Sequence, residues 1–406
     1  MQTTSSQSIE STYGWMLAVL SLAMVSVVFV AATSIPLLLK PMGADLGVST
    51  TSLAQVHMSM MFGAAFGGLL FGHLHDRIGF FPLGVIGAMA VSGGLVGMAM
   101  AEETWVLYIC VGLLIGVMGQ GVFFSPTAAA LSQWFDRHRA LAIAMVASGQ
   151  GVGGLLLAPA LRWAAYHWGW REALLGFGVI GGLLLLACAF AFRRKIPVAR
   201  APRSSAAAAT SPAAVLYQPS RACMIILSGS LALSCFATFL VIGHVTAAAE
   251  ERGATQMFAT MMVSSMMGAS LVTRLGGAAA SRRIGNYRTL VFATALHLAG
   301  STLLALPGSN YILSMSMGVI LMGLGFGAYL PGYAVLVREF FPAHEAGRRI
   351  GEINFFAFIA SGLGSWVGGW LRDSSGSYHM AFIVCAASNV VAVVALASQW
   401  KSLKKY

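Results

Sequence analysis

Residues Gly72–Gly79 read GHLHDRIG, and residues Ala278–Gly285, which lie 206 positions further along the chain, read AAASRRIG. Both segments end in isoleucine and glycine, and each follows the second long apolar run of its half of the sequence. A match at this offset indicates two related halves in a parallel repeat. The sequence therefore predicts one structural unit that is used twice.

The composition is that of a protein that crosses a membrane many times. Hydrophobic residues make up 58% of the 406 positions and charged residues 9%, whereas a soluble chain has about 25% charged residues. A span needs about 20 apolar residues, and six candidate spans precede a polar stretch while six follow it. The candidates are Trp15–Leu39, Leu53–Leu74, Phe80–Met100, Trp105–Leu131, Ala140–Leu161, Ala173–Phe192, Cys223–Ala248, Gln256–Ala280, Thr289–Leu306, Tyr311–Val337, Ile350–Leu371 and Met380–Ala397. We therefore expect an all-α membrane protein with twelve transmembrane helices in two six-helix pseudo-repeats.

The polar stretch divides the chain, and the basic residues orient it. The expected parts are a cytoplasmic N-terminus at 1–14, a bundle at 15–192, a cytoplasmic linker at 193–222, a second bundle at 223–400 and a cytoplasmic tail at 401–406. Most of the 24 Lys and Arg residues fall in loops on the side of the two termini, which the positive-inside rule places in the cytoplasm. The net charge of +11 thus reflects membrane orientation and calls for no nucleic-acid partner. We expect a multi-pass monomer in a bacterial inner membrane.

Nothing in the sequence indicates an enzyme. Five cysteines lie in apolar runs without CxxC spacing, which favours packing roles over disulfides or metal ligands. The small-residue stretches Gly112–Gly121 and Gly149–Gly154 are typical of close helix packing rather than phosphate binding. We expect neither a metal nor a cofactor.

One charge stands inside an apolar span. Arg274 is the only formal charge between Arg252 and Arg282. A charge at the centre of a span costs about 2.5–3.5 kcal/mol on insertion scales, and it usually faces a cavity or a partner. However, Arg274 also lies eight residues before Arg282, about 12 Å along a helix, so its side chain could extend to the membrane interface. Position alone leaves both interpretations open.

The loop between the second and third spans carries a motif that resembles the loop signature of the major facilitator superfamily, a family of twelve-helix secondary transporters. The motif residues are Gly72, Asp76, Arg77 and Gly79. The resemblance implies a gating loop, in which glycine permits close backbone approach and Asp76 caps or pairs with neighbouring helix ends. The chain departs from the family where basic residues are expected, since Phe80 and Phe81 follow the last glycine. In the second half, Arg282 occupies the acidic position.

Three further segments resemble carriers of organic acids. Glu10–Trp15 (ESTYGW) and Trp134–Ala142 (WFDRHRALA) resemble the two signatures of the monocarboxylate transporter family. Arg274–Thr289 aligns without gaps with the eighth span of the bacterial oxalate:formate antiporter, a relative of that family. In both relatives the arginine that matches Arg274 binds a substrate carboxylate, so the resemblance implies that Arg274 binds substrate. A guanidinium suits this role because it stays charged and offers a planar, bidentate fork.

Two departures from these relatives bear on the substrate and its coupling. Phe358 falls about where the oxalate carrier has a second cation, which leaves one buried cation to balance one carboxylate. Ser270 stands one helical turn before Arg274, where monocarboxylate transporters carry an acid. A coupled proton would then reside on the substrate or on a histidine, although a lone membrane histidine often has a structural role. The histidine candidates are His57, His244 and His297.

Other candidate substrate-binding residues lie in the fourth, tenth and eleventh spans. Two tyrosines four residues apart share one helix face, and residues of the fourth and eleventh spans fall near substrate positions of the relatives. Each could equally form a helix–helix contact. The candidates are Tyr329, Tyr333, Gln120, Phe124, Asn354 and Phe358.

The sequence predicts a secondary active transporter of small organic monocarboxylates, such as lactate, pyruvate or related hydroxy acids. We expect proton coupling and alternating access, with the halves rocking about a site near the bilayer midplane. An organic-anion exchanger is the main alternative, because exchange needs no protonatable residue. A multidrug exporter, in which Arg274 would be structural, and a non-transporting sensor on the same fold are the others.

Overall fold

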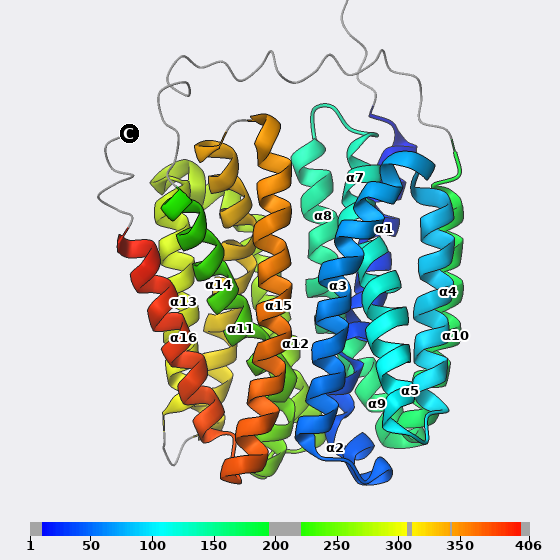
Figure 1. Ribbon diagram of the computed structural model, residues 1–406, viewed down its shortest axis with the longest axis vertical. Coiled ribbons are helices and arrows are strands. Elements are labelled where there is room, and N and C mark those ends of the chain that lie inside the picture. Colours follow the sequence, from blue (N-terminus) through cyan, green and yellow to red (C-terminus); the bar gives the residue numbers. More distant parts are fainter. Residues whose placement is uncertain (1–9, 195–220, 307–310, 342, 399–406) are drawn as a thin grey trace, which may run out of the picture.

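The computed structural model describes residues 10–194, 221–306, 311–341 and 343–398. Two helical bundles stand side by side (Figure 1). The first consists of α1 (Thr12–Ala32), α2 (Ser34–Leu46), α3 (Thr50–Ile78), α4 (Phe80–Ala99), α5 (Thr104–Leu107), the π-helix η1 (Tyr108–Gln120), α6 (Gly121–Phe123), α7 (Ser125–Ser132), α8 (Arg139–Val152), the π-helix η2 (Gly153–Leu157), α9 (Ala158–Trp168) and α10 (Trp170–Ala191). The second consists of α11 (Arg221–Glu251), α12 (Gln256–Ile284), α13 (Asn286–Ala305), α14 (Tyr311–Phe340), α15 (Ala343–Ser375) and α16 (His379–Ser398).

These helices confirm the predicted all-α membrane fold. Within the described ranges, eleven segments are long and apolar enough to cross a membrane. The twelfth crossing is α12, which has 29 residues and is more polar because it carries Arg274 and several serines. The predicted terminal and linker segments lie mostly outside the described residues.

The helices extend beyond the apolar runs because polar side chains cap them. The α3 helix begins at Thr50 rather than at the predicted Leu53, since Ser49 Oγ accepts the backbone N–H of Ser52 at 3.2 Å. The hydroxyl of Thr255 caps α12 in the same way. Ser and Thr are preferred at this position because they satisfy backbone donors that have no partner inside the helix.

The two repeated octets end in equivalent turns. Gly79 follows α3 with φ of +75°, and Gly285 follows α12 with φ of +89°. Glycine adopts such angles without the steric cost that a Cβ atom imposes. The repeat found in the sequence therefore corresponds to one turn geometry that is used once in each bundle.

The two ends of the molecule differ in how the bundles meet. We call the end at which α10 stops and α11 starts the linker face, and the opposite end the far face (Figure 1, top and bottom). At the far face the buried carboxylate of Glu250 in α11 pairs with Arg162 in α9, and it lies 3.6 Å from Lys40 Nζ in α2. Asp373 in α15 accepts the N–H of Thr51 in α3 at 2.8 Å and its hydroxyl at 2.7 Å. These contacts hold the two bundles together at the far face.

Close packing of α3 on α15 completes the closure of the far face. A Cβ atom added to Gly369 would lie 2.8 Å from the Cβ of Ala54, and one added to Gly362 would lie 3.1 Å from the carbonyl oxygen of Met58. Glycine permits the helix backbones to approach this closely in membrane bundles.

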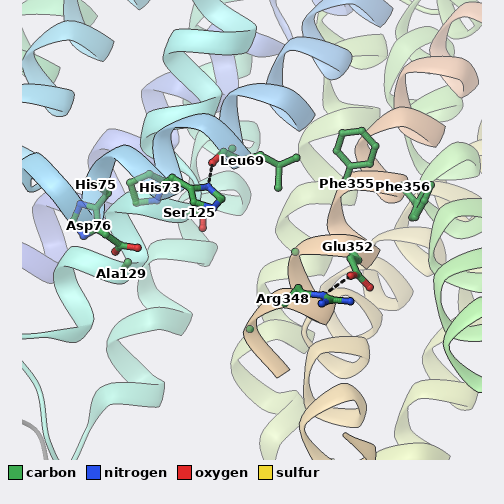
Figure 2. Close-up of a pocket in the computed structure, with 15 residues that line it drawn as sticks. Leu69, His73, His75, Asp76, Ser125, Ala129, Arg348, Glu352, Phe355 and Phe356 are labelled. Carbon is green, nitrogen blue, oxygen red and sulfur yellow. Dashed lines mark hydrogen bonds and ion pairs between the residues drawn. The ribbon is translucent and has the colours of Figure 1, made fainter. Parts of the chain in front are cut away.

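The linker face, in contrast, is hollow. A cavity of about 660 Å³ separates the end of α3 and the start of α7 from the start of α15 (Figure 2). Cβ atoms added to Gly72 or Gly351, on opposite sides of this cavity, would meet nothing within 4 Å. The molecule is therefore open toward its linker face and closed at its far face.

Candidate functional site

Arg274 reaches sideways from the second bundle into the first. Its Nη1 donates a hydrogen bond to the carbonyl oxygen of Ala147 in α8 and lies 3.2 Å from Oε1 of Gln150 in the same helix. Its Cζ atom lies 5.3 Å from the ring centroid of Phe326 in α14. Only 8% of the residue is exposed. The side chain thus crosses between the bundles and does not extend along α12 to the membrane interface.

Small residues bring the three helices around Arg274 together. A Cβ atom added to Gly151 in α8 would lie 3.3 Å from Leu271 Cβ in α12, and Gly327 in α14 packs against the backbone of Ser270. Helix α12 therefore packs between α8 and α14. The Arg274 guanidinium lies near these contacts, because Arg274 is close in sequence to Ser270 and Leu271.

Two donors of this guanidinium remain unused. Nε and Nη2 of Arg274 are buried and have no hydrogen-bond partner among the described residues. A buried donor without an acceptor costs about 1–3 kcal/mol, more when it is charged. Nε and Nη2 lie on one edge of the planar group, which is an arrangement that takes both oxygens of a carboxylate. The two donors therefore have the geometry that two parallel hydrogen bonds to one carboxylate require.

No described acid neutralises Arg274. Ser270, one turn earlier, donates its hydroxyl to the carbonyl oxygen of Met267 at 2.7 Å and so is occupied within its own helix. The arginine carries its positive charge among neutral groups, namely an amide, a carbonyl oxygen and an aromatic face.

The two candidate tyrosines lie behind Phe326, inside the second bundle. Tyr329 is fully buried, and its hydroxyl lies 2.7 Å from Oγ1 of Thr238 in α11. Its ring centroid is 5.7 Å from that of Phe326 and 6.3 Å from that of Tyr333. Neither tyrosine lines the cavity at the linker face, so both remain predictions as substrate contacts.

Two of the candidates from the fourth and eleventh spans meet between the bundles. Phe124 and Phe358 pack edge to face across the two bundles with ring centroids 5.7 Å apart. Phe66 and Phe355 form a second such pair at 5.3 Å, and Phe355 lines the cavity at the linker face. The remaining candidates, Gln120 and Asn354, are half-buried.

The three candidate histidines fall into two environments. His57 Nδ1 lies 2.8 Å from Oγ of Ser365, and His244 Nε2 lies 2.7 Å from the carbonyl oxygen of the same serine. His297 is enclosed in the second bundle, where both of its ring nitrogens have partners, Thr238 at 2.9 Å and Asn389 at 3.0 Å. None of the three lines the cavity at the linker face, whereas His73 and His75 do.

The loop motif lies at the rim of that cavity. Gly72 and Asp76 are part of its lining, and Arg77 is exposed beside them. Figure 2 shows Asp76 on one wall and Arg348 with Glu352 on the other. The close backbone approach implied for Gly72 is not made in this conformation, because the linker face is open.

The two segments that resemble the monocarboxylate transporter signatures, Glu10–Trp15 and Trp134–Ala142, meet at the linker face. Both carboxylate oxygens of Glu10 bind the middle of the second segment: Oε1 accepts the backbone N–H groups of Arg137 at 2.8 Å and His138 at 2.6 Å, and Oε2 lies 2.7 Å from His138 Nδ1. The hydrogen bond with the His138 side chain, aided by the backbone groups, holds the pKa of the Glu10 carboxyl below its ordinary value. The ring of Tyr13 packs on Trp134 with centroids 5.3 Å apart. These contacts tie the start of α1 to the turn before α8, the helix whose Ala147 and Gln150 contact Arg274.

Sequence reasoning missed Gln150 and Phe326. The signal for Gln150 was present, since it is an amide between glycines within an apolar span. Nothing in the sequence singled out Phe326 from the other phenylalanines. Among the described residues, no group of three or more His, Cys, Asp or Glu side chains is placed to hold a metal ion.

Comparison with known proteins finds that the relatives of this chain are named as transporters. The sequence profile of the Major Facilitator Superfamily matches residues 17–319 and 227–402. Monocarboxylate transporter 12 of Rattus norvegicus is 24% identical over 343 residues, covering 77% of this chain and 70% of the relative. Monocarboxylate transporter 13 of Bos taurus is 26% identical over 330 residues, covering 79% and 74%. The MFS transporter asaE of Aspergillus flavus is 26% identical over 341 residues, covering 82% and 74%.

Solved transporter structures share the fold. The nucleoside transporter NupG superposes with a TM-score of 0.74 at 13% identity, over 96% of this chain and all (100%) of the other. The D-xylose–proton symporter gives 0.71 at 18% identity, over 94% and 96%. At such identities the similarity lies in the fold alone.

Proposed function

This chain belongs to the major facilitator superfamily, and from that premise we propose that it carries small organic monocarboxylates across a membrane by alternating access. The observation that carries the proposal is the free edge of Arg274, whose buried Nε and Nη2 have no described partner. A carboxylate fits this edge in charge, in geometry and in number of acceptors. The relatives named monocarboxylate transporters support the same substrate class.

The surroundings of Arg274 favour one carboxylate over two. A single positive charge balances a single negative one, while the second charge of a dicarboxylate would stay uncompensated at a cost of several kcal/mol in a low-dielectric interior. Phe326 beside the guanidinium offers an apolar surface to the rest of a small acid, such as lactate, pyruvate or a related hydroxy acid.

Arg274 does not line the cavity at the linker face, and we propose that substrate enters through this cavity before it reaches the arginine. The walls of the cavity belong to both bundles, and the Phe66–Phe355 pair lies at its edge. Rocking of the bundles would close this cavity and part the contacts of the far face, as expected for a carrier of this superfamily.

Proton coupling and exchange are the two modes that this site allows. Because no described acid faces Arg274, a symported proton would enter with the substrate carboxyl group. The same absence favours exchange as a second candidate mode. An unloaded site leaves a buried positive charge uncompensated, whereas a bound anion neutralises it before the bundles move.

We further propose that the linker face is cytoplasmic and that the protein works as a monomer in a bacterial inner membrane. The basic loops support this orientation. A multidrug exporter is disfavoured, because a drug without an anionic group would leave the two donors of Arg274 unsatisfied.

Uptake of labelled lactate or pyruvate into proteoliposomes tests the proposal. The Arg274→Ala variant loses two charge-assisted hydrogen bonds, each worth about 1.5–3 kcal/mol, so uptake should fall by about 10²-fold or more. Arg274→Lys should also fail, because an ammonium lacks the planar fork. Arg282→Ala, an exposed residue on the same helix, is the matched control and should retain uptake. Normal uptake by Arg274→Ala would refute the proposal.

A further inference from the structure

Two histidines from different bundles meet at one serine within the closed far-face half of the molecule. His57 in α3 contacts the hydroxyl of Ser365 at 2.8 Å, and His244 in α11 contacts the carbonyl oxygen of the same residue at 2.7 Å. The exposed fractions of the two histidines are 0% and 1%. Ser365 lies in α15, so His57 reaches its partner across the boundary between the bundles.

Each ring keeps one nitrogen without a partner. A carbonyl oxygen only accepts hydrogen bonds, so Nε2 of His244 carries a hydrogen, and Nδ1 is the unprotonated nitrogen of the neutral ring. Nδ1 of His244 and Nε2 of His57 have no hydrogen-bond partner among the described residues. Both rings can therefore take up a proton, and in the charged state each ring has one N–H, at Nδ1 of His244 and at Nε2 of His57, without an acceptor among the described residues.

The charged groups around the pair are already engaged. Asp373 in α15 binds Thr51, and Glu251 in α11 pairs with Arg372 at 3.0 Å. The ring of Tyr378, which precedes α16, lies 5.3 Å from that of His244. The other charged or titratable groups of the neighbouring elements toward the far face are Lys40 and Asp45 in α2, Tyr108 in η1, and Glu250 in α11, which pairs with Arg162.

Helix α15 also packs tightly against the Nε2 side of the His244 ring. A Cβ atom added to Gly368 in α15 would lie 2.8 Å from Nε2 of His244. A buried charge without a partner costs several kcal/mol. The pair is therefore compatible with the closed far face only while both rings are neutral.

We propose that His57 and His244 form a proton-binding site that is filled only when the far face opens. Opening separates α3 from α15 and exposes His57 to water, where an imidazole takes up a proton near pH 6.5. Protons on the far side then hold the carrier open toward that side, because the charged ring cannot return to its dry position. Neither histidine lines the cavity at the linker face, so this proton stays on the far side and does not travel with the substrate.

This inference rests on the proposed carrier function, but its test needs no substrate. In a variant without the five native cysteines, Ala54→Cys places a thiol where α3 packs on α15. Thr51→Cys, at the contact with Asp373, is a second reporter if the first variant folds poorly. The measurement is labelling from the far side by an impermeant maleimide at pH 5.5 and 7.5. Rates are divided by those of Ser374→Cys, which is exposed on the same face, to remove the pH dependence of thiol reactivity.

Protonation near pH 6.5 predicts that the normalised labelling rate at pH 5.5 is about tenfold that at pH 7.5. His57→Gln, whose amide can still bond to Ser365, should abolish this difference, and His244→Gln should reduce it. His167→Gln is the control, because His167 is exposed at the far face, and it should keep the full difference. Equal rates at both pH values, or an undiminished difference in both glutamine variants, would overturn the inference. Arg274→Ala should keep the tenfold ratio between the labelling rates at the two pH values, whatever its absolute rates, so failure of the carboxylate proposal can be told apart from failure of this one.

Discussion

Gln150 and Arg274 join the two bundles through a single contact of 3.2 Å between an amide oxygen and a guanidinium nitrogen. Ala147 and Gln150 both contact Nη1 of Arg274. The donors Nε and Nη2 on the opposite edge of the guanidinium have no partner among the described residues. The first bundle thus orients the group with which the second bundle is proposed to bind substrate.

Changes at Gln150 should alter substrate affinity by way of Arg274. Gln150→Leu removes one orienting hydrogen bond, worth about 0.5–1.5 kcal/mol net, and should raise KM about 2- to 12-fold. Gln150→Glu places a carboxylate beside Arg274 and should abolish transport through internal neutralisation. Gln133→Glu, exposed at the end of α7, is the control. Wild-type kinetics for Gln150→Glu would mean that Arg274 does not meet the substrate.

The number of negative charges on the preferred substrate should match the number of basic side chains at the proposed site. Malonate and oxalate are expected to compete poorly against labelled lactate in the wild type. Phe358→Lys introduces a second cation between the bundles and should improve dicarboxylate competition at least tenfold relative to lactate. Phe356→Lys, on the exposed wall of the cavity, separates this effect from general attraction of anions. Stronger competition by a dicarboxylate in the wild type would reveal a cationic group that we have not identified.

The ion pair of Arg162 with Glu250 should stabilise the conformation that is closed at the far face. Their side chains are 4% and 8% exposed. Removing one partner of a buried pair costs about 3–5 kcal/mol, and this cost applies only while the far face is closed. Glu250→Gln should therefore increase far-side labelling of Ala54→Cys. Arg162→Gln combined with Glu250→Gln should bring the labelling rate part of the way back toward that of the parent. Strictly additive effects of the two changes on labelling would argue against a direct coupling between Arg162 and Glu250.

Because of the Glu10–His138 contact, the stability of the folded protein should decrease at low pH. Because the pKa of Glu10 is lowered in the folded protein, its stabilising effect is present above the ordinary value of 4.5 and is lost as the pH falls through the lower, folded-state value. Glu10→Gln should therefore lower Tm slightly at pH 7, and its difference from the wild type should shrink below about pH 4. Thermal unfolding in detergent at both pH values measures this difference. A constant difference in Tm across the range would show that the carboxylate charge is unimportant.

The membrane orientation can be read from two cysteines on opposite faces. Ser374→Cys at the far face should react with impermeant reagent in intact cells, and Ile78→Cys at the linker face should react only after permeabilisation. Both positions are exposed, and the five native cysteines are buried. The reverse pattern would place the linker face outside.

The sequence by itself determined the all-helical membrane fold, the repeat and the unusual status of Arg274. Hydropathy is a property of consecutive residues, so apolar runs of sufficient length specify spans whatever lies beside them. The φ values of Gly79 and Gly285 likewise follow from a local requirement that only glycine meets at no cost.

Only the tertiary structure decided which side chains share an environment. Arg274 meets Gln150, 124 positions away in sequence, and His57 meets Ser365, 308 positions away. Tyr329 is enclosed within the second bundle, where its hydroxyl lies beside that of Thr238 in α11. Helical periodicity fixes which residues share a face of one helix, but the partner of that face is set by how helices distant in sequence pack, and this depends on non-local glycine contacts such as Gly151 against Leu271.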